Sequence, residues 1–185
     1  MYTIVLEGLP ASGKTSVANL LKDRYGFYKV NESLGYLRKE SITETQEEVF
    51  NETVQKYLRA KKSKQNTVID RGYPSLLAWD YCAEKLGYSH NLEEKNKWVN
   101  NSLRKHELYE PDLYLYIQIS PKTSLVRRPR FKNEDDVWSS LFGMESCLDF
   151  YKNFFSSDRK NVIFLDGSNS VENIEHKIRD IIHGL

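Results

Sequence analysis

Cysteine is scarce in this chain of 185 residues: it has only Cys82 and Cys147, and their spacing fits no metal site. We therefore expect two free, partly buried thiols in a protein of a reducing compartment. Long apolar runs are also absent, since none approaches the roughly 20 residues of a membrane-spanning helix and the mean hydropathy is -0.62. No basic segment followed by an apolar signal core opens the sequence. These absences predict a cytoplasmic protein without a membrane partner.

An excess of charge of one sign is missing too. The 27 Lys and Arg residues are balanced by 26 Asp and Glu residues, which leaves a formal net charge of +1. Such a balance argues against a protein that holds nucleic acid by bulk positive charge. The four histidines are scattered, and no pair of them has the spacing of a zinc site. No Pro/Gly-rich linker or repeat divides the chain, so we expect a single domain over residues 1–185.

Apolar runs and helical patterns alternate along the chain. Short apolar runs predict strands at 2–6, 27–30, 67–69, 113–119 and 162–165. Apolar residues at helical spacing predict helices at 14–25, 42–64, 74–86, 93–108, 137–155 and 171–183. Pro121 stands where a further helix can begin, because its fixed φ suits a first turn. The alternation predicts an α/β fold of three layers, with about five mostly parallel strands and helices on both faces.

One motif carries specific chemistry. Residues 8–15, GLPASGKT, match G-x-x-x-x-G-K-[ST] in full, between a predicted strand and a predicted helix. In such a loop the backbone N–H groups surround phosphate oxygens at a helix N-terminus, the lysine reaches the β- and γ-phosphates, and the hydroxyl binds Mg²⁺. The sequence therefore predicts that the chain binds a nucleoside triphosphate and Mg²⁺. The candidate nucleotide-binding residues are Gly8, Pro10, Ala11, Ser12, Gly13, Lys14, Thr15 and Ser16.

Other classes of phosphate-loop protein fit less well. The segment 96–99, NKWV, lacks the aspartate of a guanine-reading motif, and 70–73, DRGY, is not the DxxG turn of a GTPase switch. Oligomeric ATP-driven motors generally have longer chains. Small-molecule kinases are therefore the class that the sequence favours.

Further segments then suggest a family. Residues 68–71, VIDR, end a predicted strand, and 70–80, DRGYPSLLAWD, place Asp, Arg, Ser and Ala in register with the pattern DRYxxSxxAYQ. The segments 110–113 (EPDL), 120–127 (SPKTSLVR) and 165–168 (LDGS) follow in order. In these motifs the chain resembles, nearly end to end, the thymidylate kinase and deoxynucleoside kinase group of P-loop kinases.

The resemblance implies a fold and an activity. It implies the P-loop kinase fold with a short lid at about 127–136, and transfer of the ATP γ-phosphate to a nucleoside or nucleoside monophosphate. The adenine would lie near Gly167, and the resemblance also hints at a homodimer packed through long helices. Nucleic acid is not expected as a partner, because only the lid segment is strongly basic.

Three residues at predicted strand ends are the candidates on the acceptor side. Asp70 can bind Mg²⁺ through water or orient the attacking group, and Arg71 can hold the 5′ oxygen or phosphate of the acceptor. For Glu32 the resemblance implies a general base that accepts the proton of a 5′-hydroxyl. Asn31 departs from the arginine that thymidylate kinases place there to hold a monophosphate, although Arg38 or Arg59 can substitute from the next helix.

The lid segment is the second source of catalytic candidates. Cations are concentrated in its sequence, at Lys122, Arg127, Arg128, Arg130 and Lys132. The segment is either a solvated charged loop or a lid that closes over ATP and places arginines against the transferring phosphoryl group. On the second interpretation Arg127 and Arg130 are catalytic and Arg128 binds ATP.

The sequence leaves the acceptor open. Tyr36, Phe50, Trp79 and Tyr81 can stack on a base, although aromatic residues in such helices more often belong to the core. Asp80 stands where thymidylate kinases carry glutamine, which favours a base with an exocyclic amine or an acceptor that is not a nucleoside. The alternatives are a P-loop kinase with a non-nucleoside hydroxyl acceptor, a nucleotide-binding module without turnover, and a nucleic-acid end-kinase.

Overall fold

The structure is a computed structural model that describes residues 1–32, 46–88, 91–128, 137–156 and 161–184. The strands are β1 (Thr3–Glu7), β2 (Tyr28–Val30), β3 (Thr67–Asp70), β4 (Leu113–Gln118) and β5 (Val162–Asp166). The helices are α1 (Lys14–Tyr25), α2 (Gln46–Lys62), α3 (Tyr73–Lys85), α4 (Leu92–Arg104), α5 (Pro121–Arg127), α6 (Leu141–Ser156) and α7 (Val171–His183), with a 3-10 turn at Val137–Ser139.

The five strands form one parallel sheet in the order β2-β3-β1-β4-β5. Because all strands run the same way, their carboxyl ends meet at one edge of the sheet, where open α/β folds bind ligands. β1 lies between β3 and β4, so the loop after β1 starts in the middle of that edge. This is the geometry that brings residues from distant parts of the sequence together.

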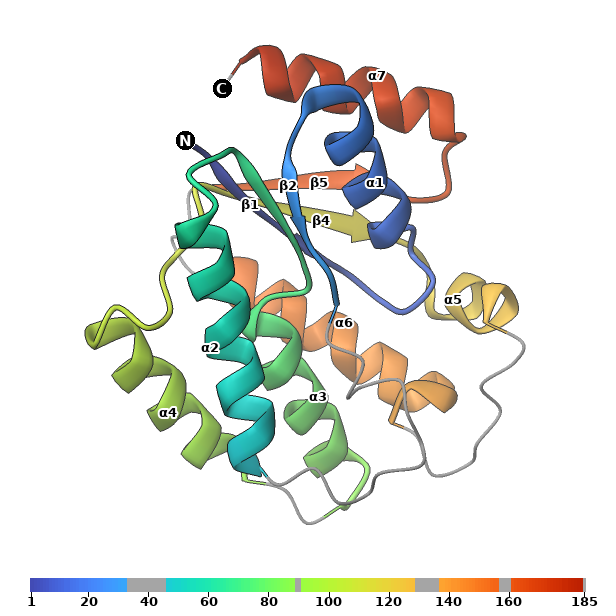
Figure 1. Cartoon of the computed structure of the whole chain (residues 1–185). Coiled ribbons are helices and arrows are strands. Elements are labelled where there is room, and N and C mark those ends of the chain that lie inside the picture. Colours follow the sequence, from blue (N-terminus) through green and yellow to red (C-terminus); the bar gives the residue numbers. More distant parts are fainter. Residues whose placement is uncertain (33–45, 89–90, 129–136, 157–160, 185) are drawn as a thin grey trace.

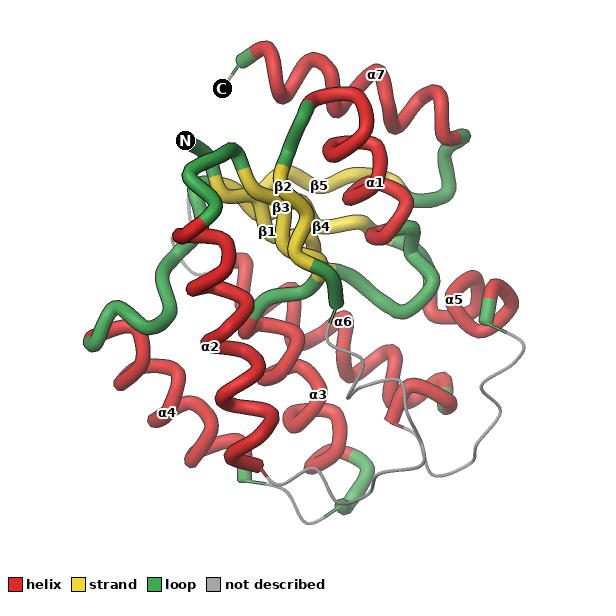
Figure 2. The backbone as a smooth tube through the Cα atoms, in the orientation of Figure 1, coloured by secondary structure: helices red, strands yellow, loops and turns green. Residues whose placement is uncertain are grey.

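Helices cover both faces of the sheet (Figure 1). α1 and α7 lie on one face, and α2, α3 and α6 lie on the other, with α4 packed outside α3. Successive strand residues point to opposite faces, so Ile4 and Leu6 join the core under α1 and α7, whereas Val5 joins the core on the α3 and α6 side. The tube view shows the same three layers (Figure 2). The predicted α/β architecture is therefore confirmed.

Two predicted helix boundaries are wrong, and each has a local cause. The helix predicted to reach residue 108 ends at Arg104, because His106 adopts the left-handed conformation with φ 58°. The helix predicted from 137 begins at Leu141, after the 3-10 turn. There the Ser140 hydroxyl accepts a hydrogen bond from the Gly143 N–H at 2.9 Å, which is the bond of a helix N-cap.

Both cysteines of the chain lie in the interior of the fold. Cys82 and Cys147 are both free and buried, as expected for structural thiols. Among the described residues, no helix is both long enough and apolar enough to cross a membrane.

Candidate active site at the carboxyl edge of the sheet

The loop between β1 and α1 contains a glycine that no other residue can replace. Gly8 has φ 140°, and a Cβ atom there would lie 2.4 Å from the backbone oxygen of Ile117 on β4. Glycine is required for both reasons, because it tolerates positive φ and brings the loop directly against the sheet. The loop then turns through Ala11, at φ 55°, into α1. Its N–H groups therefore precede a helix N-terminus, which favours an anion.

Lys14 is the first residue of α1, and its side chain folds back over the loop. Its Nζ donates to the backbone oxygens of Gly8 at 3.1 Å and Leu9 at 2.7 Å, and to Ser12 Oγ at 3.3 Å. Burial, and after it the positive charge of Arg71, lowers the pKa of Lys14 to about 7, although the nearby carboxylates oppose this shift. A bound polyanion would favour the charged form of this amine.

Thr15 and Asp70, predicted as the metal-binding pair, lie together in the structure. Thr15 Oγ1 donates to Asp70 Oδ2 at 2.8 Å, although 55 residues separate them. Asp70 is only 1% exposed. Its second oxygen, Oδ1, is buried and has no hydrogen-bond partner within the described ranges. A buried carboxylate oxygen without a partner is an available ligand position.

Arg71 and Glu32, predicted on the acceptor side, form an ion pair. Arg71 Nε lies 2.6 Å from Glu32 Oε1, and Arg71 Nη1 donates to the backbone oxygen of Gly8 at 3.2 Å and to Ser75 Oγ at 3.1 Å. The guanidinium also lies 5.8 Å from the ring centre of Trp138. Burial acts to lower the pKa of Arg71, but the surrounding carboxylates, led by Glu32, raise it above its usual value. The side chain therefore keeps its charge inside the protein.

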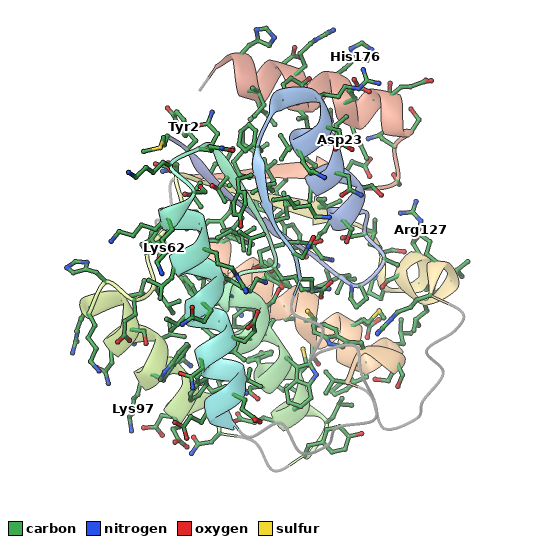
Figure 3. The ribbon with its side chains drawn as sticks, in the orientation of Figure 1. Tyr2, Asp23, Lys62, Lys97, Arg127 and His176 are labelled. Atoms are coloured by element: carbon green, nitrogen blue, oxygen red, sulfur yellow. The ribbon has the colours of Figure 1, made fainter. Side chains whose placement is uncertain are left out.

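Helix α5, which leads into the predicted lid, packs beside the phosphate loop. Ser124 on α5 donates to the backbone oxygen of Pro10 at 2.6 Å. Arg127, at the end of α5 (Figure 3), donates from Nη1 to the backbone oxygen of Gly167 at 2.9 Å. Arg128 follows as the cap of α5. Arg130 and Lys132, the rest of the predicted lid, lie outside the described residues.

Gly167 itself lies close to the phosphate loop. A Cβ atom there would lie 2.9 Å from the backbone oxygen of Ser12 and 2.8 Å from the side chains of Ile117 and Ile119. The segment after β5 therefore passes directly over the loop, next to the place predicted for the adenine.

The residues predicted to read a base have partners within the protein. Asp80 is fully buried and pairs with Lys95 on α4 at 2.5 Å, and Lys95 lies 5.6 Å from the ring centre of Trp79. Two further aromatic candidates also pack between helices. The ring centres of Phe50 and Trp98 are stacked 4.1 Å apart, and those of Tyr81 and Phe150 lie 5.7 Å apart.

Of the two arginines predicted to substitute for a monophosphate-binding arginine, only Arg59 lies among the described residues. Arg59 pairs with Glu52 at 2.7 Å, and both side chains are exposed. Arg38, like the aromatic candidate Tyr36, lies outside the described residues. The structure therefore brings Glu32, Asp70 and Arg71 to the phosphate loop and leaves Arg59 on the surface of α2.

Two buried charged residues at the same edge were missed by the sequence analysis. Glu7 ends β1, and its carboxylate accepts hydrogen bonds from the Gly72 N–H, the Ser75 hydroxyl and the Tyr151 hydroxyl. Lys56 on α2 donates from Nζ to the backbone oxygens of Asp70 and Arg71. A signal existed for each: an acid closes an apolar strand in one case, and a lysine interrupts the buried stripe of a helix in the other.

Known proteins that resemble this chain in sequence include thymidylate kinases. No protein-family model matches the chain. A thymidylate kinase of Malacoplasma penetrans is 23% identical over 95% of this chain and 92% of its own length. A probable thymidylate kinase of Picrophilus torridus is 26% identical over 83% of this chain and 81% of its own.

Solved structures of similar fold include those of deoxyadenosine kinase from M. mycoides. One, with the products dCMP and dCDP bound, has a TM-score of 0.77 at 15% sequence identity and covers 99% of this chain. Another, with dATP bound, has a TM-score of 0.71 at 16% identity. Both are covered over 100% of their own length. The resemblance stated from the motifs is confirmed: the chain is similar to thymidylate kinases in sequence, and it has the P-loop kinase fold of deoxyadenosine kinase.

Proposed function

We propose that the protein is an ATP- and Mg²⁺-dependent kinase that transfers the γ-phosphate of ATP to the 5′ oxygen of a nucleoside or nucleoside monophosphate. One observation carries the proposal. The phosphate loop, the Thr15–Asp70 pair and the Arg71–Glu32 pair meet at one edge of the sheet, although they come from three separate strands. Phosphoryl transfer needs this set, because it depends on neutralising phosphate charge and holding the acceptor in line.

On the donor side, Lys14 would bind the β- and γ-phosphates once it leaves the loop oxygens that it now contacts. Arg127, already beside Gly167, would approach the nucleotide from α5. A deoxyadenosine kinase of similar fold has been solved with dATP bound, which supports nucleotide binding by this chain. Arg128 and Arg130 complete the set of lid arginines in the proposal.

Mg²⁺ fits the residues present. Asp70 offers a buried Oδ1 with no hydrogen-bond partner among the described residues, and Thr15 Oγ1 lies beside its other oxygen. Mg²⁺ commonly takes only one or two protein ligands and completes its shell with phosphate oxygens and water. The ion would supply charge stabilisation at the phosphates.

On the acceptor side, Glu32 would accept the proton of a 5′-hydroxyl, and Arg71 would hold the 5′ oxygen or a phosphate through its remaining donors. Glu32 is 21% exposed at its side chain whereas Arg71 is 9% exposed, so the carboxylate is the more accessible partner. The ion pair between them fixes the two groups relative to each other. A homodimer and the absence of a nucleic-acid partner stay predictions.

The test is ADP release with Mg·ATP across parallel panels of deoxynucleosides, their 5′-monophosphates and simple sugars. We expect turnover on at least one nucleoside or monophosphate, at a rate that does not fall with added salt. Turnover on sugars alone would replace the proposal with a kinase of non-nucleoside hydroxyls. Binding of ATP with no turnover on any panel would indicate a nucleotide-binding module and would contradict the proposal.

A further inference from the structure

Arg71 has an unusual backbone conformation for its size. Its φ is 61°, in the left-handed region that long L side chains rarely adopt. The next residue, Gly72, has no room for a side chain, because a Cβ atom there would lie 2.5 Å from the Tyr57 hydroxyl. Such turns persist where surrounding groups hold them, and they are concentrated at functional sites. The structure shows what holds this one from each side.

On the carbonyl side the turn is held by Lys56 of α2. Its Nζ donates to the Asp70 oxygen at 2.7 Å and to the Arg71 oxygen at 2.5 Å. Lys56 is only 4% exposed, and burial lowers its pKa to about 8. A buried amine is retained here because it pairs with two carbonyl groups at the end of β3.

On the amide side the turn is held by Glu7 of β1. Its Oε1 accepts the Gly72 N–H at 2.9 Å, and its Oε2 accepts the Ser75 hydroxyl at 2.5 Å and the Tyr151 hydroxyl at 2.7 Å. Glu7 is fully buried. Burial raises its pKa, while these three hydrogen bonds and the charge of Arg71 oppose the rise.

Glu7 also orients the guanidinium through Ser75. A serine hydroxyl has one proton, and Ser75 donates it to Glu7, which leaves its lone pairs to accept from Arg71 Nη1 at 3.1 Å. The same guanidinium pairs with Glu32 and donates to the phosphate-loop residue Gly8. Both the backbone and the head group of Arg71 therefore depend on Glu7.

We infer that Glu7 and Lys56 are positioning residues of the phosphoryl transfer: together they hold the left-handed turn at Arg71, so that its guanidinium stays between Glu32 and the phosphate loop. The kinetic consequences of this inference rest on the proposed function. Its structural consequences concern only the position of Arg71. Neither residue needs to touch a substrate. A displacement of about 1 Å in a reacting arrangement can cost about 10²-fold in rate.

The experiment compares Lys56→Met, Lys56→Arg and Glu7→Gln with the matched control Thr53→Val. Thr53 is buried on the same helix as Lys56, but among the described residues its hydroxyl bonds only within the helix, to the Val49 oxygen at 2.8 Å. We expect Lys56→Met and Glu7→Gln to lower kcat/KM for the acceptor by about 10–100-fold with an unchanged Kd for ATP. Lys56→Arg, which keeps the charge and donors, should recover part of the loss, and Thr53→Val should lower only the unfolding temperature.

A double-mutant cycle separates positioning from general destabilisation. If Lys56 acts through Arg71, Lys56→Met should cost nothing further in kcat/KM when it is added to Arg71→Met. Additive losses in that cycle, or variants that lose stability while kcat/KM stays at the wild-type value, would overturn the inference.

An NMR measurement keeps the inference testable without turnover. The Arg71 Nε–H, paired with Glu32, should give a distinct protected signal in a ¹⁵N correlation spectrum of the wild type. Lys56→Met and Glu7→Gln should shift or broaden it, whereas Thr53→Val should leave it in place. An unchanged signal in both variants would overturn the inference even if the protein is a kinase, and a changed signal would support it even if no acceptor is found.

Discussion

The donor side and the acceptor side of the candidate site are built in different ways. The donor side is one continuous segment, residues 8–15, in which backbone groups and a single lysine would bind the phosphates. The acceptor side is assembled from side chains that end three strands and begin one helix: Glu7, Glu32, Arg71 and Ser75. A continuous backbone motif binds what many proteins share, whereas an assembled set of side chains can differ from one protein to the next. The donor is therefore well specified here, and the acceptor is not.

The largest effect should come from the donor side. Lys14→Met removes the cation predicted to bind the β- and γ-phosphates and should lower turnover by at least about 10³-fold. ADP release measures this, with Lys97→Met as control, because Lys97 is an exposed residue of α4 paired only with its neighbour Glu93 in the described structure. Unchanged kcat would contradict the donor assignment.

The same variant tests the burial of Lys14 through stability. Its folded-state pKa of about 7 lies below the ordinary lysine value of 10.5, so below pH 7 the folded protein bears the full cost of a buried charged amine. As the pH rises from 7 toward 10.5 the folded state loses this proton first, and the wild type gains stability relative to Lys14→Met. Thermal unfolding of both proteins at pH 6 and pH 9 measures the difference. A constant difference across this range would contradict a buried, neutralisable lysine.

The next largest effect is expected at Glu32, on the acceptor side. Glu32→Gln should lower kcat by about 10²-fold or more, because general-base contributions are of this size, and it should leave the Kd for ATP unchanged. Steady-state kinetics with ATP titration calorimetry distinguishes the two quantities. A change confined to ATP affinity would contradict the acceptor role of Glu32 and would assign this residue to the donor side.

A smaller effect on turnover, with a larger one on stability, is expected at Asp80. Asp80→Asn breaks a buried ion pair with Lys95, and loss of one partner of such a pair costs about 3–5 kcal/mol. Denaturant unfolding should show this loss, and the double variant with Lys95→Met should recover part of it. Acceptor preference should stay the same; a switch of preferred base in a protein of normal stability would make Asp80 a base-reading residue.

The smallest expected effect is the uptake of a proton by the donor side when Mg·ATP binds. At pH 8 an amine with a pKa of about 7 is mostly neutral, and the charge of bound ATP should restore its proton. Calorimetry in buffers of different ionisation enthalpy should then show proton uptake with Mg·ATP at pH 8 and much less at pH 6. Lys14→Met should abolish the uptake. Equal uptake in the wild type and the variant would assign it to another group.

The difference between the two sides also explains how far the sequence alone could lead. The phosphate loop is visible because its chemistry lies within eight consecutive residues, and the strand rhythm around it predicts the sheet. The sequence signals at Glu7 and Lys56 could mark these residues but not their roles, because their partners are backbone groups and hydroxyls more than ten residues away. Asp80 was placed near a base by its register in a motif, but its ion pair with Lys95 depends on how α4 packs against α3.

Helix boundaries show the same limit on a smaller scale. The periodicity of 93–108 continues past the true end of α4, because it does not reveal that His106 takes a left-handed turn. The start of α6 at Leu141 follows from the Ser140 cap, a signal that the apolar pattern of 137–155 hides. The spacing of apolar residues indicates which face of a helix is buried, whereas single residues determine where the helix begins and ends.

The most direct test of the account follows the phosphoryl group itself. The wild type, Lys14→Met and Glu32→Gln are incubated with ATP labelled at the γ-phosphorus and with the acceptor that gives turnover in the panel, and the product is located by ³¹P NMR. The account predicts labelled phosphate on the 5′ position of the nucleoside or monophosphate, at a rate sharply reduced in both variants. Label released only as inorganic phosphate, or transfer that survives Lys14→Met, would contradict it.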